Sequence, residues 1–556
     1  MQQQLFLRPG AAEGAAREVD KAAGKQCIDM PIFFLIIFAK MALRTVNPDG
    51  IMAHLASYLL PILFLLFLLS FVHAKFNGLN KIPGPTIASF TKLWRLYDVW
   101  QGQAHWTAIK LHRKYGKLVR IAPNVVSVGD PDEIQRIYNI KGNFTKTAFY
   151  PIQSISWQKK PQPNLFSERN EAEHREQRRK VANAYTLESL LKMEPAIDEC
   201  TKLFLSQMGE YADRDEPVDL GQWLQYYAFD VVGELTFAKK LGFLEKGGDV
   251  DGMIEAIEGM LIYASHCGQV PEMHPWLLGN PLFSIMLPAM ETWNGVLMFT
   301  LKAINSRTTL SRDGELELEE SRVGDDFLSK WAAVKAFDPL KMSTRDVVVH
   351  LSGNVFAGSD TTAIALRAIL YFLMKHPDKL RKLQREIDDA HNAGKLSDPI
   401  SDKEARDLPY LNAVEKEAMR LHSSVGLILE RHVPAEGATI CGELIPGGTI
   451  VGINPWVLQY DPEVFPDPEA FVPERWIDSS PDRLAAMDKS FFTFGAGSRA
   501  CLGRYISMIE MRKVIPQLLR EFDISLQGDE EWKVKNVWFT QQDMPKCIMR
   551  RRSKME

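Results

Sequence analysis

The sequence predicts a mostly α-helical protein with a small β region, preceded by an N-terminal transmembrane helix. Three observations predict this fold class: an apolar run at residues 51–74, helical patterning through most of residues 90–545, and a few short β-branched segments within that stretch. The sequence shows no internal repeat and no long low-complexity linker after residue 90. We therefore expect one large domain behind the anchor.

The apolar run has the length and composition of a membrane anchor. From Ile51 to Ala74 it contains no Asp, Glu, Lys or Arg, enough for about 36 Å of helix. A cleaved signal peptide is the alternative, but the run starts late and lacks a small-residue cleavage site. Lys75 and Lys81 follow it, which favours a cytoplasmic C-terminal body.

These features divide the chain into four parts. The sequence KIPGP marks a stiff turn that separates the membrane segment from the folded body. We expect an unassigned N-terminal extension at 1–50, the anchor at 51–74, a Pro/Gly hinge at 75–89 and the main domain at 90–556.

Charge and cysteine content exclude two classes of protein. The formal net charge of -4 argues against a nucleic-acid-binding protein, which would show a concentrated basic excess. The six cysteines lie far apart with no CxxC pair, unlike a small disulfide scaffold. A reducing compartment is the simpler inference.

Local patterns predict a long helix, an irregular segment and two strands. Residues 343–376 open with the capping-box-like sequence STRD and stop before Pro377, which would give a helix of about 50 Å. The proline-rich residues 461–475 cannot propagate a helix and predict an ordered meander. Residues 118–123 and 449–453 predict strands.

A glycine-rich turn with a single cysteine precedes an amphipathic helix near the C-terminus. Its sequence is FTFGAGSRACLGR, from residue 492 to 504. Gly495, Gly497 and Gly503 allow positive φ angles and the close approach of a flat ligand. N–H groups of the turn can donate to the Cys501 sulfur, and Arg499 can meet a carboxylate of that ligand.

Three other interpretations of Cys501 remain open on composition alone: a structural cysteine, a zinc ligand and part of a dinucleotide-binding loop. A lone buried cysteine is most often structural. Zinc is disfavoured because no second Cys or His lies at ligand spacing. Gly495, Gly497 and Ala500 also spell GxGxxA, but too little chain follows for the strands and helices of a dinucleotide-binding fold.

The segment resembles the heme-binding loop FxxGxRxCxG of the cytochrome P-450 family. The fixed positions are matched by Phe494, Gly497, Arg499, Cys501 and Gly503, and Gly495 lies next to Phe494 in the same loop. The resemblance covers about residues 80–550, and it implies the P-450 fold with heme b as cofactor. It also implies that the cysteine is the axial iron ligand and that the other five residues contact the cofactor.

A second motif lies in the middle of the long predicted helix. Residues 357–362, AGSDTT, resemble the oxygen-activation motif of the family, which places Asp360 and Thr361 beside the iron. Cleavage of dioxygen consumes protons, and a hydroxyl with a neighbouring carboxylate can relay them through water. Taken alone, such a trio in a helix is more often solvated or bonded to its own backbone.

Glu417 and Arg420 lie three residues apart and hence on one helix face. The ExxR pattern is weak alone, since residues 176–179 repeat it. The resemblance selects the first pair because PERW follows at the family distance. It implies a buried structural cluster of Glu417, Arg420 and Arg475, whose charges must satisfy one another.

Two further arginines are implied as partners of the heme propionates. HREQRR stands where the family commonly has WxxxR, so His174 replaces the tryptophan and Arg178 is the expected contact. Arg431, in LERHVP, matches another propionate contact of the family. From the residues alone, the first segment could equally be an exposed basic helix face.

The resemblance implies a reductase-dependent monooxygenase that inserts one oxygen atom from O2 into an organic substrate. It implies electrons from NADPH through a separate NADPH-cytochrome P-450 reductase, with cytochrome b5 as a second candidate donor. Basic residues that could dock the reductase are Arg178, Arg179, Arg504, Arg512 and Lys513. With the anchor, these expectations place the chain in the endoplasmic reticulum membrane, single-pass, with a cytoplasmic catalytic domain.

The resemblance implies the substrate class only in general terms. The chain resembles fungal members of the pisatin demethylase-like group, which favours secondary metabolism by analogy. The segments implied to face the substrate are mostly apolar and favour an apolar, medium-sized molecule: Phe149 and Tyr150, 254–263, 356–361, 425–429 and 539–542. The alternatives are an isomerase or dehydratase of the same fold, and a non-catalytic heme-binding membrane protein. Both fit poorly with intact oxygen-activation residues.

Overall fold

The computed structural model describes residues 72, 77–140, 143–157, 160–278, 295–310, 316–318 and 324–552. The predicted extension at 1–50 and all of the predicted anchor except Val72 lie outside these residues. Within them, one helix is long and apolar enough to cross a membrane, and it is mostly buried inside the protein. That helix is α17, a core element.

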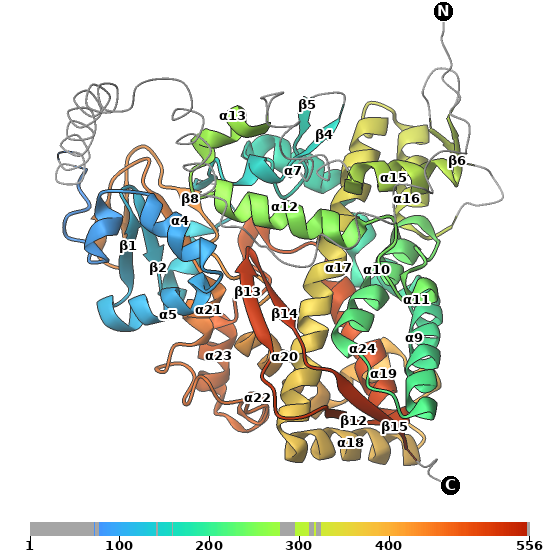
Figure 1. The fold of residues 1–556 in the computed structure, drawn as a ribbon. Helices are drawn as coiled ribbons and strands as arrows, with labels where there is room; N and C mark the ends of the chain where they lie inside the picture. Colours follow the sequence, from blue (N-terminus) through green and yellow to red (C-terminus); the bar gives the residue numbers. More distant parts are fainter. Residues whose placement is uncertain are drawn as a thin grey trace, which may run out of the picture. The chain divides into compact units, whose positions relative to one another are not determined.

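Helix α17 (Thr344–Lys375) confirms the predicted long helix. The Ser343 side chain accepts from the N–H of Asp346, whose carboxylate accepts from the N–H of Ser343, so the predicted capping box is complete. The helix ends at His376, before Pro377. It runs through the body of the domain with other helices on several sides (Figure 1).

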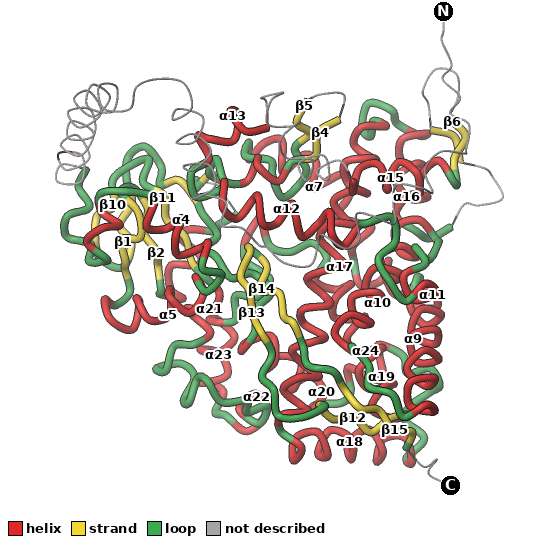
Figure 2. The backbone as a smooth tube through the Cα atoms, in the orientation of Figure 1, coloured by secondary structure: helices red, strands yellow, loops and turns green. Residues whose placement is uncertain are grey.

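Of the helices that pack on α17, three position the candidate site: α10 (Leu220–Phe237), α20 (Pro409–Leu421) and α24 (Arg504–Glu521). Figure 2 shows that helices dominate the described fold, as predicted. The other helices are α4 (Leu93–Trp100), α5 (Ala104–Tyr115), α6 (Ile134–Ile137), α7 (Glu171–Val181), α8 (Leu187–Leu191), α9 (Glu194–Arg214), α11 (Phe243–Lys246), α12 (Met253–Cys267), α13 (His274–Leu278), α15 (Gly295–Asn305), α16 (Phe327–Phe337), α18 (Pro377–Asn392), α19 (Asp402–Arg406), α21 (Pro455–Gln459), α22 (Arg475–Asp478) and α23 (Pro481–Ser490).

Both predicted strands are confirmed and belong to one sheet. Its strand order is β1-β2-β11-β8-β3, with β1 (Leu118–Ala122) antiparallel to β2 (Val125–Val128) and β11 (Ile450–Ile453) parallel to β2. β8 (Arg431–His432) pairs with β11 on one side and with β3 (Thr145–Lys146) on the other, so the edge strands are β1 and β3. The remaining pairs are β4 (Ile155–Trp157) with β5 (Lys160–Gln162), β6 (Thr308–Leu310) with β7 (Leu316–Leu318), β9 (Ala438–Ile440) with β10 (Glu443–Ile445), β12 (Phe522–Leu526) with β15 (Cys547–Arg551), and β13 (Lys533–Val537) with β14 (Phe539–Asp543).

The predicted meander is also confirmed. Residues 461–474 contain no helix or strand, and α22 starts only at Arg475. The buried Arg420 donates hydrogen bonds to two carbonyl oxygens of the meander, those of Pro468 and Ala470. Irregular backbone thus obtains the hydrogen bonds that regular structure would have supplied.

Candidate functional site

The loop that carries Cys501 is closed by backbone hydrogen bonds and lies directly before α24. The N–H of Cys501 donates to the Phe494 carbonyl over 2.8 Å, and the N–H of Gly495 donates to the Phe492 carbonyl over 3.0 Å. Gly495 and Gly497 have φ angles of +65° and +64°, as predicted. These bonds fix the cysteine at a defined point between a tight turn and a helix.

Gly497 is required for a second reason. A Cβ atom on this residue would lie 1.6 Å from the backbone oxygen of Tyr138. Sequence reasoning missed Tyr138, whose hydroxyl donates to the Leu429 carbonyl and accepts from the N–H of Ile453. Tyr138 therefore approaches the cysteine loop with its backbone, while its side chain joins the sheet to the segment before β8.

The prediction that Gly503 supplies a positive φ is wrong. Its φ is -81°, and it is the N-cap of α24. A Cβ added there would meet nothing within 4 Å, so packing inside the chain does not select glycine at this position. The N-cap geometry explains the negative φ, because the chain is already turning into a right-handed helix.

Cys501 combines an exposed surface with surrounding hydrogen-bond donors. The residue is exposed, whereas the other described cysteines are buried or half-buried. It nevertheless lies deep enough in the protein for desolvation to raise the pKa of its thiol, while the N–H of Gly503 and the charges of Arg178 and Arg504 act to lower it. Arg178 also donates from Nη1 to the Ala500 carbonyl over 3.0 Å, next to the cysteine.

A cluster of buried cations surrounds the approach to this loop. Burial together with the charges of Arg431 and Arg499 lowers the pKa of Lys146 well below its usual value. Burial lowers the pKa of His174 to about 3, helped by Arg499, Lys146 and Arg178. His174 is therefore a neutral imidazole near neutral pH, and the positive charge of this region comes from the arginines, which call for an anionic group nearby. The two carboxylates of heme fit this requirement, and the accessible thiol beside them fits the iron.

Lys146 was missed by sequence reasoning. It lies in the apolar sequence FTKTAFY, and its ammonium group lies over the rings of Tyr150 and Phe166 and donates to the Phe166 carbonyl. A lone lysine between aromatic residues, in a strand of an otherwise apolar stretch, was the available signal.

Arg499 is paired with a carboxylate of the chain itself. Its Nη2 lies 2.7 Å from Glu171 Oε1, and its Nη1 donates to the Glu168 carbonyl over 2.8 Å. Arg431, by contrast, donates to the Tyr150 hydroxyl over 2.9 Å and to its neighbour's carbonyl. Of the predicted carboxylate contacts, Arg499 therefore has an internal competitor in Glu171, whereas the acceptors of Arg431 within the described part of the chain are neutral.

Asp360 and Thr361 lie in the middle of α17. Asp360 is 2% exposed, and its Oδ1 accepts from Gln225 Nε2 over 2.7 Å. Burial raises the pKa of Asp360 to about 6. The Thr361 hydroxyl donates to the Ala357 carbonyl over 2.8 Å, and Ser424 donates to the Thr361 carbonyl over 3.1 Å. The hydroxyl oxygen of the next residue, Thr362, lies 2.9 Å from the hydroxyl oxygen of Ser507 in α24. This hydrogen bond joins the middle of α17 to the helix that follows the cysteine loop.

The structure brings the three residues of the predicted charged cluster together. Glu417 Oε1 accepts from Arg420 Nη2 over 2.8 Å and from Arg475 Nε over 3.0 Å. All three residues are buried.

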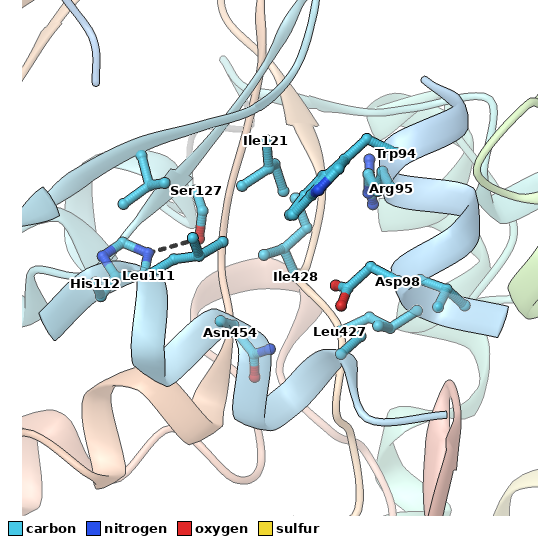
Figure 3. A pocket seen from close by; sticks show the side chains of 14 residues that line it. Trp94, Arg95, Asp98, Leu111, His112, Ile121, Ser127, Leu427, Ile428 and Asn454 are labelled. Atoms are coloured by element: carbon cyan, nitrogen blue, oxygen red, sulfur yellow. Dashed lines mark hydrogen bonds between the residues drawn. The ribbon is translucent and has the colours of Figure 1, made fainter. Parts of the chain in front are cut away.

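The predicted substrate-facing segments meet only in part. Val425 forms a β-bridge with Phe539, whose ring centroid lies 6.4 Å from that of Phe356 on α17. Leu427 and Ile428, however, line a different and mostly apolar cavity of about 40 Å³ beside α4, α5 and β1 (Figure 3). The segment 425–429 is therefore divided, because Val425 contacts the Phe539 strand while Leu427 and Ile428 line this cavity.

The predicted basic docking set needs a correction. The Lys513 side chain is only 1% exposed and pairs with Glu194 and Asp198, so it cannot meet a partner protein. Arg512 is mostly buried too. Arg179 and Arg504 are exposed. Helix periodicity placed residues 512 and 513 on α24 correctly but could not say which faces other helices cover.

The fold and the site together define a mostly helical domain in which the exposed Cys501 lies on a glycine-rich turn. Residues 82–546 match the family model described as "Cytochrome P450". The chain therefore belongs to the cytochrome P450 family.

Its relatives include a cytochrome P450 monooxygenase of Aspergillus terreus, 38% identical over 83% of this chain and 93% of the relative. A pisatin demethylase of Fusarium vanettenii is 36% identical over 87% of this chain and 92% of that protein. The monooxygenase cicH of Emericella nidulans is 37% identical over 83% of this chain and 91% of that protein.

Membership confirms the predicted enzyme class, a P450 monooxygenase. The family uses heme with an axial cysteine thiolate, and its electrons come from NADPH through a redox partner. The protein accordingly acts on a small molecule with the help of a reductase.

Proposed function

We propose that this protein inserts one oxygen atom from O2 into an apolar, medium-sized organic substrate in fungal secondary metabolism, with Cys501 as the axial ligand of heme b. The observation that carries the ligand assignment is the accessible Cys501 thiol, which has the backbone N–H groups of Gly503 and Arg504 as donors and the positive charges of Arg178 and Arg504 nearby. Similarity to fungal monooxygenases, one of them named a pisatin demethylase, supports the metabolic setting.

The thiolate of the bound heme would donate electron density that favours cleavage of the O–O bond. The chain's part is to hold that thiolate and to neutralise the propionates. The N–H groups of Gly503 and Arg504 moderate the charge on the Cys501 sulfur. Arg178 and Arg431 are the proposed propionate partners. Arg499 would join them by giving up its ion pair with Glu171 and pairing with a propionate instead. Phe494, Gly495 and Gly497 shape the loop that the cofactor lies against.

Asp360 and Thr361 are the proposed proton relay. Because burial raises the pKa of Asp360 to about 6, its carboxyl group can both give and take a proton near neutral pH. The Thr361 hydroxyl keeps acceptor capacity while it donates to the Ala357 carbonyl. An isomerase or dehydratase of the same fold would not need this pair.

The position in the cell is part of the same proposal. The apolar residues 51–74 would anchor the protein by a single pass in the endoplasmic reticulum membrane, with the catalytic domain in the cytoplasm. Exposed Arg179 and Arg504 would contribute to docking an NADPH-cytochrome P450 reductase, and cytochrome b5 would compete for a similar face.

The test is the carbon monoxide difference spectrum of the reduced protein. We expect the thiolate-type spectrum in the wild type and its loss in Cys501→Ser, because a neutral hydroxyl cannot supply the thiolate charge. The matched control is Cys441→Ser, a half-buried cysteine in another part of the fold. An unchanged spectrum in Cys501→Ser overturns the ligand assignment.

A further inference from the structure

Arg95 of α4 is a buried cation whose partner lies in a distant part of the sequence. The residue is 7% exposed, and its Nη2 lies 2.5 Å from Oε1 of Glu430, which is 3% exposed. Figure 3 shows Arg95 on α4 and Ile428 on the segment before β8, and both residues line the small apolar cavity described above. The ion pair therefore joins α4 to the chain just before β8, inside the protein.

The second oxygen of Glu430 is also occupied. Thr147 Oγ1 donates to Glu430 Oε2 over 2.6 Å, and Thr147 is 1% exposed. A buried carboxylate needs both a counter-charge and hydrogen-bond donors. Arg95 supplies the charge and one donor, and Thr147 supplies the other donor. The Glu430 carboxylate is thus held in place by two elements that lie far from it in the sequence.

The strand pairing explains why this carboxylate is separated from the arginine that follows it. Lys146 of β3 is the Cα partner of Arg431 of β8. The neighbours of this pair, Thr147 and Glu430, are joined by their side chains. Successive side chains along a strand point to opposite faces, so the two pairs lie on opposite faces. The contacts agree, since Arg431 donates to the Tyr150 hydroxyl while Glu430 accepts from Thr147.

The separation matters because Arg431 is the proposed partner of a heme propionate. Opposite charges attract strongly in a poorly solvated interior, so an unpaired Glu430 would compete with a propionate for Arg431. Arg499 shows such a competition already, because its Nη2 lies 2.7 Å from Glu171. Arg95 prevents the same pairing at Arg431 by binding the carboxylate itself.

We propose that Arg95 is a positioning residue for heme: it holds Glu430 away from Arg431, so that the positive charge of Arg431 stays available to a propionate. The inference rests on the proposed role of Arg431 as a propionate partner. Arg95 acts through Glu430 rather than by contact with the cofactor. Because the ion pair has no net charge, Arg95 also neutralises the Glu430 charge that would otherwise act on the heme iron.

The first test measures the reduction potential of the heme iron in the holoenzyme by spectroelectrochemistry. Arg95→Met leaves the negative charge of Glu430 without compensation, which stabilises the ferric over the ferrous iron and should lower the potential. Glu430→Gln leaves the positive charge of Arg95 without compensation and should raise the potential. Potentials that stay at the wild-type value in both variants, or that move in the same direction, overturn the proposal.

The second test measures how fast the holoenzyme loses heme to an excess of apomyoglobin. We expect about tenfold faster loss in Arg95→Met, because Glu430 then competes with the propionate for Arg431. The double variant Arg95→Met/Glu430→Gln should return to nearly the wild-type rate, since no carboxylate remains to compete. A double variant that loses heme as fast as Arg95→Met would show that Arg95 acts through packing alone, and the proposal would fail.

The matched control is another buried ion pair of the same chain. Arg307 Nη1 lies 2.8 Å from Asp326, and the two side chains are 7% and 2% exposed. Arg307→Met breaks this pair outside the residues assigned to the cofactor, so it should lower stability while the potential and the rate of heme loss stay at their wild-type values. If Arg307→Met changes both readouts as much as Arg95→Met does, general destabilisation explains the effect and the positioning role is wrong.

Arg431→Gln separates this inference from the proposed function. Heme loss at the wild-type rate in Arg431→Gln would remove Arg431 from the propionate contacts, and the role of Arg95 would fall with it. Faster loss in Arg431→Gln together with wild-type behaviour of Arg95→Met would leave the propionate contact standing and overturn only the inference. We expect both variants to lose heme faster, with the larger effect in Arg431→Gln.

Discussion

Two glutamates on helix α20, Glu415 and Glu417, are both fully buried and yet have opposite surroundings. Two residues apart on an α-helix, they point to nearly opposite sides. Glu417 faces the meander, and Glu415 faces α24. Helix α20 therefore carries one buried glutamate that is paired with donors and one that is not.

Glu417 is saturated with donors. Arg420, Arg475, Trp476 and the N–H of Val472 all donate to its two oxygens. The attraction between Glu417 and the two arginines offsets the free energy of removing these charges from water, because the charged atoms are close together. The remaining N–H groups of Arg420 donate to backbone carbonyl oxygens. Such a cluster is stable when buried, but the loss of any one member leaves the other charges without a partner.

Glu415 has no such support. Among the described residues nothing donates a hydrogen bond to either of its oxygens, and Arg512 Nε remains 3.5 Å away. Burial raises the pKa of Glu415 to about 8, while the charge of Arg512 lowers it and that of Asp402 raises it. The comparison teaches that burial of a carboxyl group says little until its donors are known.

The largest effect is expected from Glu417→Gln. The substitution leaves Arg420 and Arg475 buried without their counter-charge, which should cost about 3 to 5 kcal/mol of folding free energy. Thermal unfolding of the heme-bound protein, with heme content measured alongside, checks this. A melting temperature equal to that of the wild type would mean that the cluster is not the structural unit described above.

An opposite and smaller effect is expected from Glu415→Gln. Because the pKa of Glu415 is raised to about 8 in the folded state, the folded protein holds this proton more tightly than the unfolded chain. Its contribution is therefore most favourable below about pH 4.5 and is lost as pH rises toward 8. At pH 7 the variant should be more stable than the wild type by about 1 to 3 kcal/mol.

Melting temperatures from pH 5 to pH 8 measure that prediction. The advantage of Glu415→Gln should grow with pH and nearly vanish at pH 5. Equal slopes for variant and wild type across this range would show that Glu415 does not titrate as described.

The smallest effect is expected at Lys416, between the two glutamates. Lys416 pairs with Asp488 at the surface and lies over the Trp476 ring, 4.2 Å from its centroid. Surface pairs contribute about 0.2 to 1 kcal/mol and are screened by salt. Lys416→Met should thus lower the melting temperature slightly at low salt and less at high salt. A loss as large as that of Glu417→Gln would contradict the ranking.

The residues around α20 also show how far the sequence could predict the site. Glu417 was found because ExxR lies at a fixed distance from PERW, and its partners followed from the family pattern. Glu415, two residues earlier, has no pattern, because its environment is made by α24 from about a hundred residues away in the chain. The same reason applies to Gln225, Tyr138 and Lys146, which local sequence does not mark as parts of the site.

The sequence by itself determined the helical class, the capped long helix, the meander, the strands at 118–123 and 449–453, and the cysteine loop with its two left-handed glycines. These features depend on local rules: periodicity, capping, proline and glycine geometry, and motif spacing. Only the tertiary structure decided that Lys513 is buried, that Glu171 competes for Arg499, and that Asp360 borders a polar cavity. Burial and pairing depend on which distant elements pack together, and no local rule contains that information.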